Sequence, residues 1–103
     1  MVNNSFQLHS VAAELVKKAC VFIVRVDMPI ETLQLILRLL SHRKIVIESL
    51  QMHAEGGGEA TLILHCQVER DRIKYSQQIL RKTQGVIGVE VLESKGSHTA
   101  GVF

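Results

Sequence analysis

The residues best suited to bind a small ligand lie at Asp27–Leu33, where an apolar stretch ends and a helix-like pattern begins. Asp27 and Pro29 end the apolar stretch, and proline suits the first turn of a helix. The N–H groups at a helix start can hold a small anion such as the carboxylate of a free amino acid. This joint therefore predicts an amino-acid site, although a plain connection between a strand and a helix explains the same residues.

Histidines and cysteines are the other candidates for chemistry, and their spacing favours structural roles. A zinc site needs several ligands at close spacing. A hairpin centred on Gly57 would place His65 opposite Ser49 and His53 opposite Thr61, so these two histidines would not pair. We therefore predict no metal site. The five histidines are scattered over different predicted elements: His9, His42, His53, His65 and His98.

Cys20 and Cys66 both lie inside apolar runs, which favours buried free thiols over a disulfide or a metal pair. No motif pairs either cysteine with a histidine or a carboxylate for nucleophilic catalysis. The carboxylates fall mostly at element ends or on polar faces, where solvation explains nearly all of them. We expect no catalytic residues and no cofactor.

Gly56-Gly57-Gly58 and the basic groups could bind phosphate, but each has a simpler interpretation. A phosphate-binding loop needs a Lys and a Ser or Thr and leads from a strand into a helix. The three glycines instead separate two alternating runs, which predicts a hairpin turn. The groups Lys17-Lys18, His42-Arg43-Lys44 and Arg70/Arg72 could form a basic patch, but a solvated surface is favoured.

Apolar periodicity predicts the elements that position these residues. Leu8–Lys18 is expected to form a short amphipathic helix. The helix at 30–42 should turn Ile30, Leu33, Ile36, Leu37 and Leu40 inward, the helix at 70–83 Ile73, Ile79 and Leu80, and the last strand Ile87, Val89 and Val91. The predicted strands are 20–26, 45–55, 59–69 and 86–93.

The order β-α-β-β-α-β predicts an α+β, ferredoxin-like sandwich. Right-handed crossovers place both helices on one face of a four-stranded antiparallel sheet, with the strands 20–26 and 59–69 at its centre. The other face would carry Ile23, Arg25, Ile63 and His65. Because that face is not fully polar, the N-terminal helix or another subunit should cover it.

Length and charge restrict the functional class. The 103 residues make one domain at 19–94, with an N-terminal extension at 1–18 and a flexible tail at 95–103. Twelve basic against ten acidic residues, and few aromatic ones, disfavour a nucleic-acid binder. Apolar runs are too short to cross a membrane, and no secretory signal is visible. We expect a cytoplasmic protein with no membrane or nucleic-acid partner.

Several of these residues together resemble a known family. The predicted order of elements, the Asp-x-Pro joint, Leu33 in the first helix and Ile47-Glu48-Ser49-Leu50 in the second strand resemble the ACT domain. More narrowly, the chain resembles the regulatory small subunit of acetolactate synthase, of the short isozyme II type. The residues behind this narrower resemblance are Glu31-Thr32-Leu33, Leu37-Arg38, His42-Arg43, Ser49 and Met52.

The resemblance implies a regulatory subunit that is not an enzyme. ACT domains pair through sheet edges, and the joint of one chain faces the second strand of its partner. A homodimer or higher homo-oligomer is therefore implied, together with a catalytic large subunit as partner. The implied effector site is Asp27, Met28, Pro29, Ile30, Glu31 and Thr32, and the implied interface residues are Ile47, Ser49, Leu50 and Met52.

The joint departs from the family pattern, because effector-binding ACT domains usually carry glycine there. Ile30 and Glu31 occupy that neighbourhood, and the Glu31 charge would compete with a ligand carboxylate for the same N–H groups. We therefore expect an amino-acid effector to bind weakly or not at all. The alternatives are a stand-alone amino-acid-sensing ACT protein and, less favoured, an RNA-binding βαββαβ module.

Overall fold

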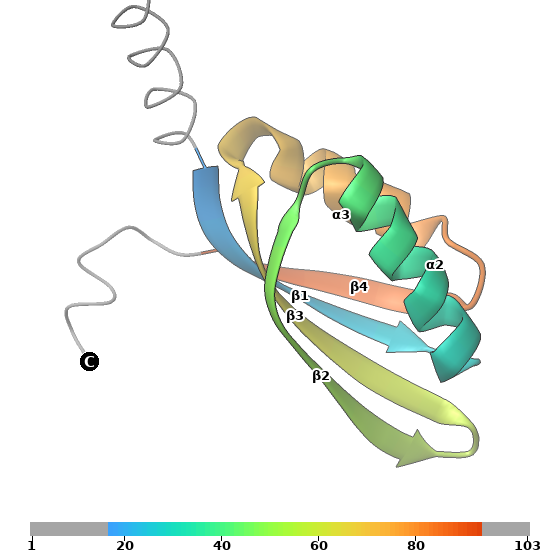
Figure 1. The fold of residues 1–103 in the computed structure, drawn as a ribbon. Coiled ribbons are helices and arrows are strands. Elements are labelled where there is room, and N and C mark those ends of the chain that lie inside the picture. Colours follow the sequence, from blue (N-terminus) through green and yellow to red (C-terminus); the bar gives the residue numbers. More distant parts are fainter. Residues whose placement is uncertain (1–16, 94–103) are drawn as a thin grey trace, which may run out of the picture.

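Four antiparallel strands form one sheet in the order β2-β3-β1-β4 within residues 17–93, the part of the chain that this computed structural model describes (Figure 1). Both helices lie on one face of the sheet. The predicted ferredoxin-like sandwich is therefore confirmed. The elements are β1 (Lys17–Val26), α2 (Pro29–His42), β2 (Val46–Gly56), β3 (Glu59–Glu69), a 3-10 turn η1 (Arg70–Arg72), α3 (Ile73–Arg81) and β4 (Val86–Glu93).

The elements of the structure differ from the predicted ones mainly in where they begin and end. Strands β3 and β4 have the predicted bounds. Strand β1 begins at Lys17, so Lys17 and Lys18, the last two residues of the predicted N-terminal helix, belong to this strand. The rest of that helix, at 8–16, and the tail at 95–103 lie outside the described residues.

Alternating side chains along the two central strands separate a buried face from an open one. Beneath the helices lie Phe22 and Val24 of β1 with Leu62 and Leu64 of β3, all fully buried. Burial of a side chain of this size stabilises the fold by about 1.5–3 kcal/mol. On the open face Ile23 and Ile63 are half-buried, while Arg25 and His65 are exposed, which matches the predicted division of the two faces.

Helix α2 packs on the sheet through a different stripe from the predicted one, with Leu33 and Leu39 partly buried beside the fully buried residues. Ile36 and Leu40 are buried as expected, but the third member of the buried row is Thr32. Ile30, predicted to point inward, is 61% exposed. Residues four apart lie above one another on a helix, so the row 32, 36, 40 faces the sheet and Ile30 falls outside it.

Three register shifts interrupt the strict alternation of side chains in the sheet, and the one near the β2–β3 turn lies between Ala54 and Gly56. The β1–β4 pairing shifts register between Arg25 and Val26, so Val86 packs against the core and Ile87, predicted to be buried, is exposed. The β2–β3 pairing shifts at Glu48, between Ile47 and Ser49. A bulge adds one unpaired residue and changes the face on which the next side chains lie.

The hairpin between β2 and β3 has the predicted register. Ser49 lies opposite His65, and His53 lies opposite Thr61. Gly56, Gly57 and Gly58 all have positive φ, between 62° and 85°. Glycine adopts such angles without a steric penalty, so the three glycines close the turn.

A left-handed residue also ends α2, and it is not a glycine. Lys44 has φ 59°, the only positive φ at a residue other than glycine between residues 17 and 93. The N–H of Ile45 donates to the Leu40 carbonyl at 3.1 Å, which closes the helix end. Left-handed backbone at a residue with a Cβ costs roughly 1–2 kcal/mol, so this position carries strain that glycine would remove.

Cys20 and Cys66 lie opposite each other on β1 and β3, and both are buried free thiols, as predicted. Burial raises the pKa of Cys20 from 9.0 to about 11, with a smaller contribution from the Glu93 charge. Burial raises the pKa of Cys66 to about 12, with smaller contributions from Cys20 and Glu48. Both thiols therefore stay protonated, and unreactive, near neutral pH.

The raised thiol pKa values predict a loss of stability at alkaline pH. Unfolding returns each thiol to its ordinary pKa of 9.0, so above that pH the unfolded chain binds fewer protons than the folded chain. The free energy of unfolding should then fall, by up to about 1.4 kcal/mol per pH unit for each thiol, until the folded pKa is reached. Urea denaturation between pH 8 and 11 measures the slope.

The matched control is the Cys20→Ala/Cys66→Ala double variant, in which lysine and tyrosine titrations remain and the thiol contribution is lost. Its stability should fall less steeply above pH 9.0, the ordinary thiol pKa. If the free energy of unfolding falls equally steeply with pH in the two proteins, the thiols do not cause the loss of stability.

Candidate functional site

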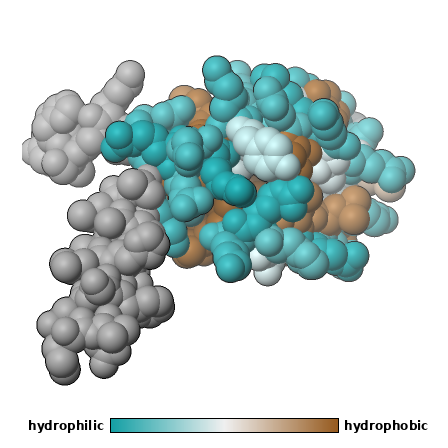
Figure 2. All heavy atoms as spheres, turned by 90° about the horizontal axis from the view of Figure 1, so that it is seen from above, coloured by the Kyte–Doolittle hydropathy of each residue, from teal (hydrophilic) through white to brown (hydrophobic). Residues whose placement is uncertain are grey.

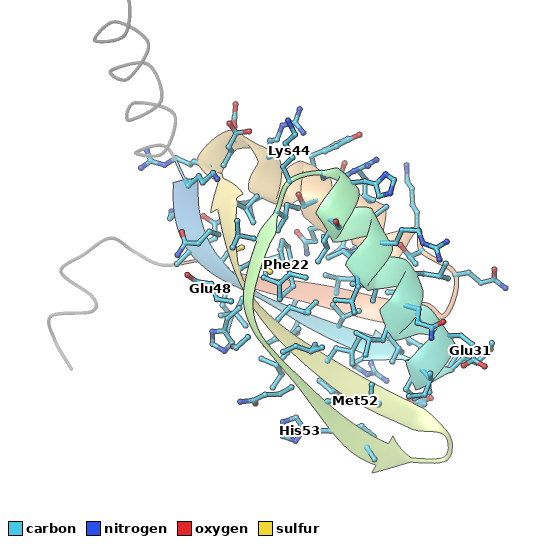
Figure 3. All side chains as sticks on the ribbon, in the orientation of Figure 1. Phe22, Glu31, Lys44, Glu48, Met52 and His53 are labelled. Carbon is cyan, nitrogen blue, oxygen red and sulfur yellow. The ribbon has the colours of Figure 1, made fainter. Side chains whose placement is uncertain are left out.

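The joint between β1 and α2 exposes most of its side chains. Met28 is the residue before the helix and makes no side-chain cap hydrogen bond, and Pro29 follows at the first turn. Met28 is 52% exposed, and Ile30 and Glu31 are exposed as well. Figure 3 shows Glu31 at the start of α2. Its carboxylate therefore lies in the turn whose N–H groups have no partner within the helix.

Backbone contacts fix the joint against the turn that follows α3. The Asp27 N–H donates to the Gly85 carbonyl at 2.9 Å, and the Thr32 N–H donates to the Met28 carbonyl at 2.9 Å. Thr32 is 1% exposed, and a Cβ built on Gly85 would overlap its hydroxyl oxygen. The joint is thus a packed connection. Sequence analysis missed the close approach of Gly85 to Thr32.

The predicted interface residues of β2 do not share one face. Ile47 packs against the core, whereas Ser49 lies on the open face opposite His65. Leu50 and Met52 pair with the buried residues Leu64 and Leu62, so they share the helix-covered face of the sheet. They are nevertheless 37% and 39% exposed, because the helix layer ends before it reaches this outer strand.

The joint and Met52 of β2 lie toward the same end of the sheet. Met52 pairs with Leu62, and Leu62 pairs with Val24, two residues before β1 ends. The structure therefore places Met52 toward the end of the sheet where the joint lies, on a strand that β3 separates from β1 (Figure 3). Neighbouring strands are about 4.8 Å apart, so β2 lies about 10 Å from β1 in the same chain.

Three cavities lie in other parts of the described chain. The first, of about 540 Å³, is at the C-terminal end of α2, and a second, of about 380 Å³, lies between α2 and the turn after α3. The third, of about 300 Å³, opens on the sheet face between β1 and β4. None of the three is lined by a residue of Asp27–Thr32.

Comparison with solved structures identifies the fold. The chain superposes on the ACT domain from GTP pyrophosphokinase of Chlorobium tepidum with a TM-score of 0.64 and 23% identity, covering 74% of this chain and 99% of that one. The fold is that of ACT domains. No protein-family model and no curated protein matches the chain.

Two further structures share this ACT-like fold. The C-terminal domain of the MgtC protein from Mycobacterium tuberculosis gives a TM-score of 0.63 at 14% identity, covering 78% of this chain and 90% of that one. A homoserine dehydrogenase from Thiobacillus denitrificans gives 0.63 at 19% identity, covering 79% of this chain and 18% of that one. At such identities the likeness concerns the arrangement of the backbone.

Two features are missing from residues 17–93: a helix that could cross a membrane and a group of side chains that could hold a metal ion. Within this range no helix is long and apolar enough to cross a membrane. The same residues contain no group of three or more His, Cys, Asp or Glu side chains placed to hold a metal ion.

The contact between Thr32 and Gly85 predicts an unusually costly Gly85→Ala substitution. The added methyl would overlap the Thr32 hydroxyl, and the backbone at φ 93° disfavours any Cβ. Overpacking and left-handed strain together should lower the free energy of unfolding by about 3 kcal/mol. Chemical denaturation measures the difference.

Gly57→Ala is the matched control, because Gly57 also has positive φ but has no atom within 4 Å of its built Cβ. It should cost only the left-handed strain, about 1 kcal/mol. Equal losses in the two variants would contradict the packing role of Gly85, as would a failure of Thr32→Ala to restore part of the stability of Gly85→Ala.

Proposed function

We propose that this chain is a regulatory ACT-domain subunit that assembles with itself through β2 and acts on a biosynthetic enzyme without catalysing a reaction. Acetolactate synthase is the best candidate for that enzyme. The ACT-like fold supports the general proposal, and the observation that carries it is the outer edge of β2, which has no strand beside it within residues 17–93.

Strand β2 has the features of an assembly edge. It is the outermost strand, with β3 on one side and no strand of residues 17–93 on the other. Its exposed side chains include Val46, Leu50 and Met52, although an isolated edge is normally protected by charges, bulges or a covering element. A second copy related by a two-fold axis would pair the edges and cover the apolar side chains on both chains at once.

The bulge at Glu48 is compatible with this pairing. It lies near the start of β2 and leaves the run from Ser49 to Ala54 regularly paired with β3. An edge-to-edge dimer would therefore use the middle of the strand, where Leu50 and Met52 lie. The joint of one chain would then face β2 of its partner, as the resemblance to ACT domains implies.

The residues of the joint favour an activating role over an amino-acid-sensing one. Ile30 and Glu31 project from the first turn of α2, and Thr32 is used to pack against Gly85. A ligand carboxylate would be repelled by the like charge of Glu31, which already interacts favourably with the N–H groups of this helix start. The interface would therefore form without an amino acid bound in it.

The choice of acetolactate synthase rests on the residues that resemble its small subunit, among them Glu31-Thr32-Leu33 and Ser49. Addition of the chain to an isolated thiamine-diphosphate large subunit should raise its activity and form a complex in gel filtration. A stand-alone amino-acid sensor would do neither and would instead melt at a higher temperature when its amino acid is present.

The edge model predicts that a charge on β2 separates the subunits. The chain should be dimeric or larger at micromolar concentration by light scattering. Met52→Lys places a buried, unpaired charge in the interface, which costs several kcal/mol and should shift the species to a monomer. The monomer should keep the circular dichroism spectrum of a folded chain, because Met52 is already 39% exposed in one subunit.

Leu92→Lys is the matched control. Leu92 is 57% exposed on β4, at the opposite edge of the sheet, so the same change there should leave the assembly intact. A chain that is strictly monomeric before substitution would contradict the edge model, and so would dissociation by Leu92→Lys alone.

We predict that valine, leucine and isoleucine bind weakly or not at all. Calorimetric titration should show no saturable heat at micromolar concentration, because Glu31 competes for the helix-start N–H groups. Glu31→Gln removes the charge and keeps the size of the side chain, so it should bind these amino acids more tightly than the unmodified chain. Clear micromolar binding by the unmodified chain would refute the prediction.

A further inference from the structure

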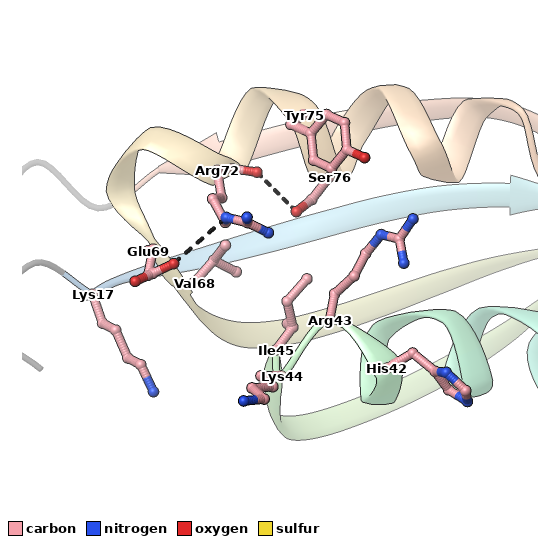
Figure 4. A pocket seen from close by; sticks show the side chains of 10 residues that line it. All are labelled: Lys17, His42, Arg43, Lys44, Ile45, Val68, Glu69, Arg72, Tyr75 and Ser76. Atoms are coloured by element: carbon pink, nitrogen blue, oxygen red, sulfur yellow. Dashed lines mark hydrogen bonds and ion pairs between the residues drawn. The ribbon is translucent and has the colours of Figure 1, made fainter. Parts of the chain in front are cut away.

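Basic residues that are far apart in the sequence meet in the cavity of about 540 Å³ at the C-terminal end of α2 (Figure 4). Lys17 comes from the start of β1, Arg43 and Lys44 follow α2, and Arg72 comes from η1. Glu69 is the only carboxylate among the lining residues. We call this cavity the basic pocket. Its volume is in the range of roughly 300–1,000 Å³ that is typical of small-molecule sites.

Arg43 lies against Tyr75 in the basic pocket, and its guanidinium has a hydrogen-bond donor that no described residue accepts from. Its guanidinium carbon lies 6.0 Å from the centroid of the Tyr75 ring, a distance at which the cation is attracted to the ring face. Its Nε is buried and has no hydrogen-bond partner in the described chain. Buried polar groups without a partner are rare in folded proteins, so Arg43 has hydrogen-bonding capacity that the described residues do not use.

Lys44 supplies a second, independent observation. Its backbone has φ 59°, where glycine would relieve the strain. A lysine at this position carries the strain and places an ammonium group at the pocket. Arg72 is oriented by Glu69, whose carboxylate oxygen lies 3.6 Å from its Nε, and Arg43 and Lys44 form no ion pair with the described residues.

Apolar side chains form the floor of the basic pocket. Ile45 and Val68 are almost fully buried there, and Figure 4 shows them between the cationic side chains. The Tyr75 ring, half exposed, adds a flat apolar wall. Cationic donors around an apolar floor suit an anion with an organic part.

We propose that the basic pocket binds the phosphate group of a small molecule. Phosphate offers a double negative charge and several acceptor oxygens, which arginine and lysine recognise better than a single carboxylate. The basic pocket and the joint lie at opposite ends of α2, which at about 1.5 Å per residue is about 20 Å long. Phosphate binding is therefore separate from the proposed role of the joint and does not depend on it.

Titration of the full chain with inorganic phosphate and with phenyl phosphate, followed by amide chemical shifts at constant ionic strength, tests the proposal. Both ligands should give saturable shifts at Lys44, Ile45 and Ser76, and acetate should bind more weakly than either. Tighter binding of phenyl phosphate than of phosphate would identify a phosphate ester as the ligand. Equal binding would identify phosphate itself.

Arg43→Gln should raise the dissociation constant for phosphate about tenfold, the usual effect of losing one charge-assisted hydrogen bond. Arg70→Gln is the matched control, because Arg70 lies in η1 beside the basic pocket but does not line it. It changes the net charge by the same amount and should weaken binding less than about twofold, as expected for a screened surface charge.

Lys44→Gly separates binding from folding. It should raise the melting temperature by about 4 °C, through relief of left-handed strain, while it weakens phosphate binding. The proposal is overturned if phosphate and phenyl phosphate give no saturable shifts at millimolar concentration. It is equally overturned if Arg70→Gln weakens binding as much as Arg43→Gln, if acetate binds as well as phosphate, or if Lys44→Gly leaves binding unchanged.

Discussion

The contact of α2 and α3 with one face of β1 and β3 determines the rest of this structure. Side chains at every second position of the two central strands are buried beneath the helices, and the row Thr32, Ile36 and Leu40 of α2 packs on them. Thr32 can lie this deep because Gly85 has no side chain. The close approach at one end of α2 sets where the helix starts, and therefore the geometry of the joint.

Two helices cover a four-stranded sheet incompletely, and the uncovered parts are those that suggest function. The layer ends before β2, which leaves Leu50 and Met52 exposed on the face where their neighbours on β3 are buried. Hydrophobic side chains beside an unpaired strand edge are unfavourable in water and favour association with a second sheet edge. The same incomplete coverage leaves Ile23 and Ile63 half-buried on the open face.

The two ends of α2 differ in chemistry. At its start, Glu31 places a negative charge where the helix dipole is positive, which stabilises the helix and disfavours an anionic ligand. At its end, Arg43 and Lys44 lie with Arg72 and Lys17 around an apolar floor. The proposed phosphate site thus lies at the opposite end of the helix from the joint that the sequence pattern emphasised.

The sequence by itself determined the order and type of the elements, the β2–β3 register from Ser49 to Ala54 and the buried thiols, because these follow from local periodicity and from three glycines in a turn. Ile30 and Ile87 were misplaced because a close contact and a bulge, both tertiary features, decide which side chains of a helix or strand face the core. Only the tertiary structure brought Lys17, Arg43 and Arg72 into one pocket. These residues come from β1, from the turn after α2 and from η1, which are distant in the chain. The spacing of residues along the sequence does not reveal that these segments lie together in space.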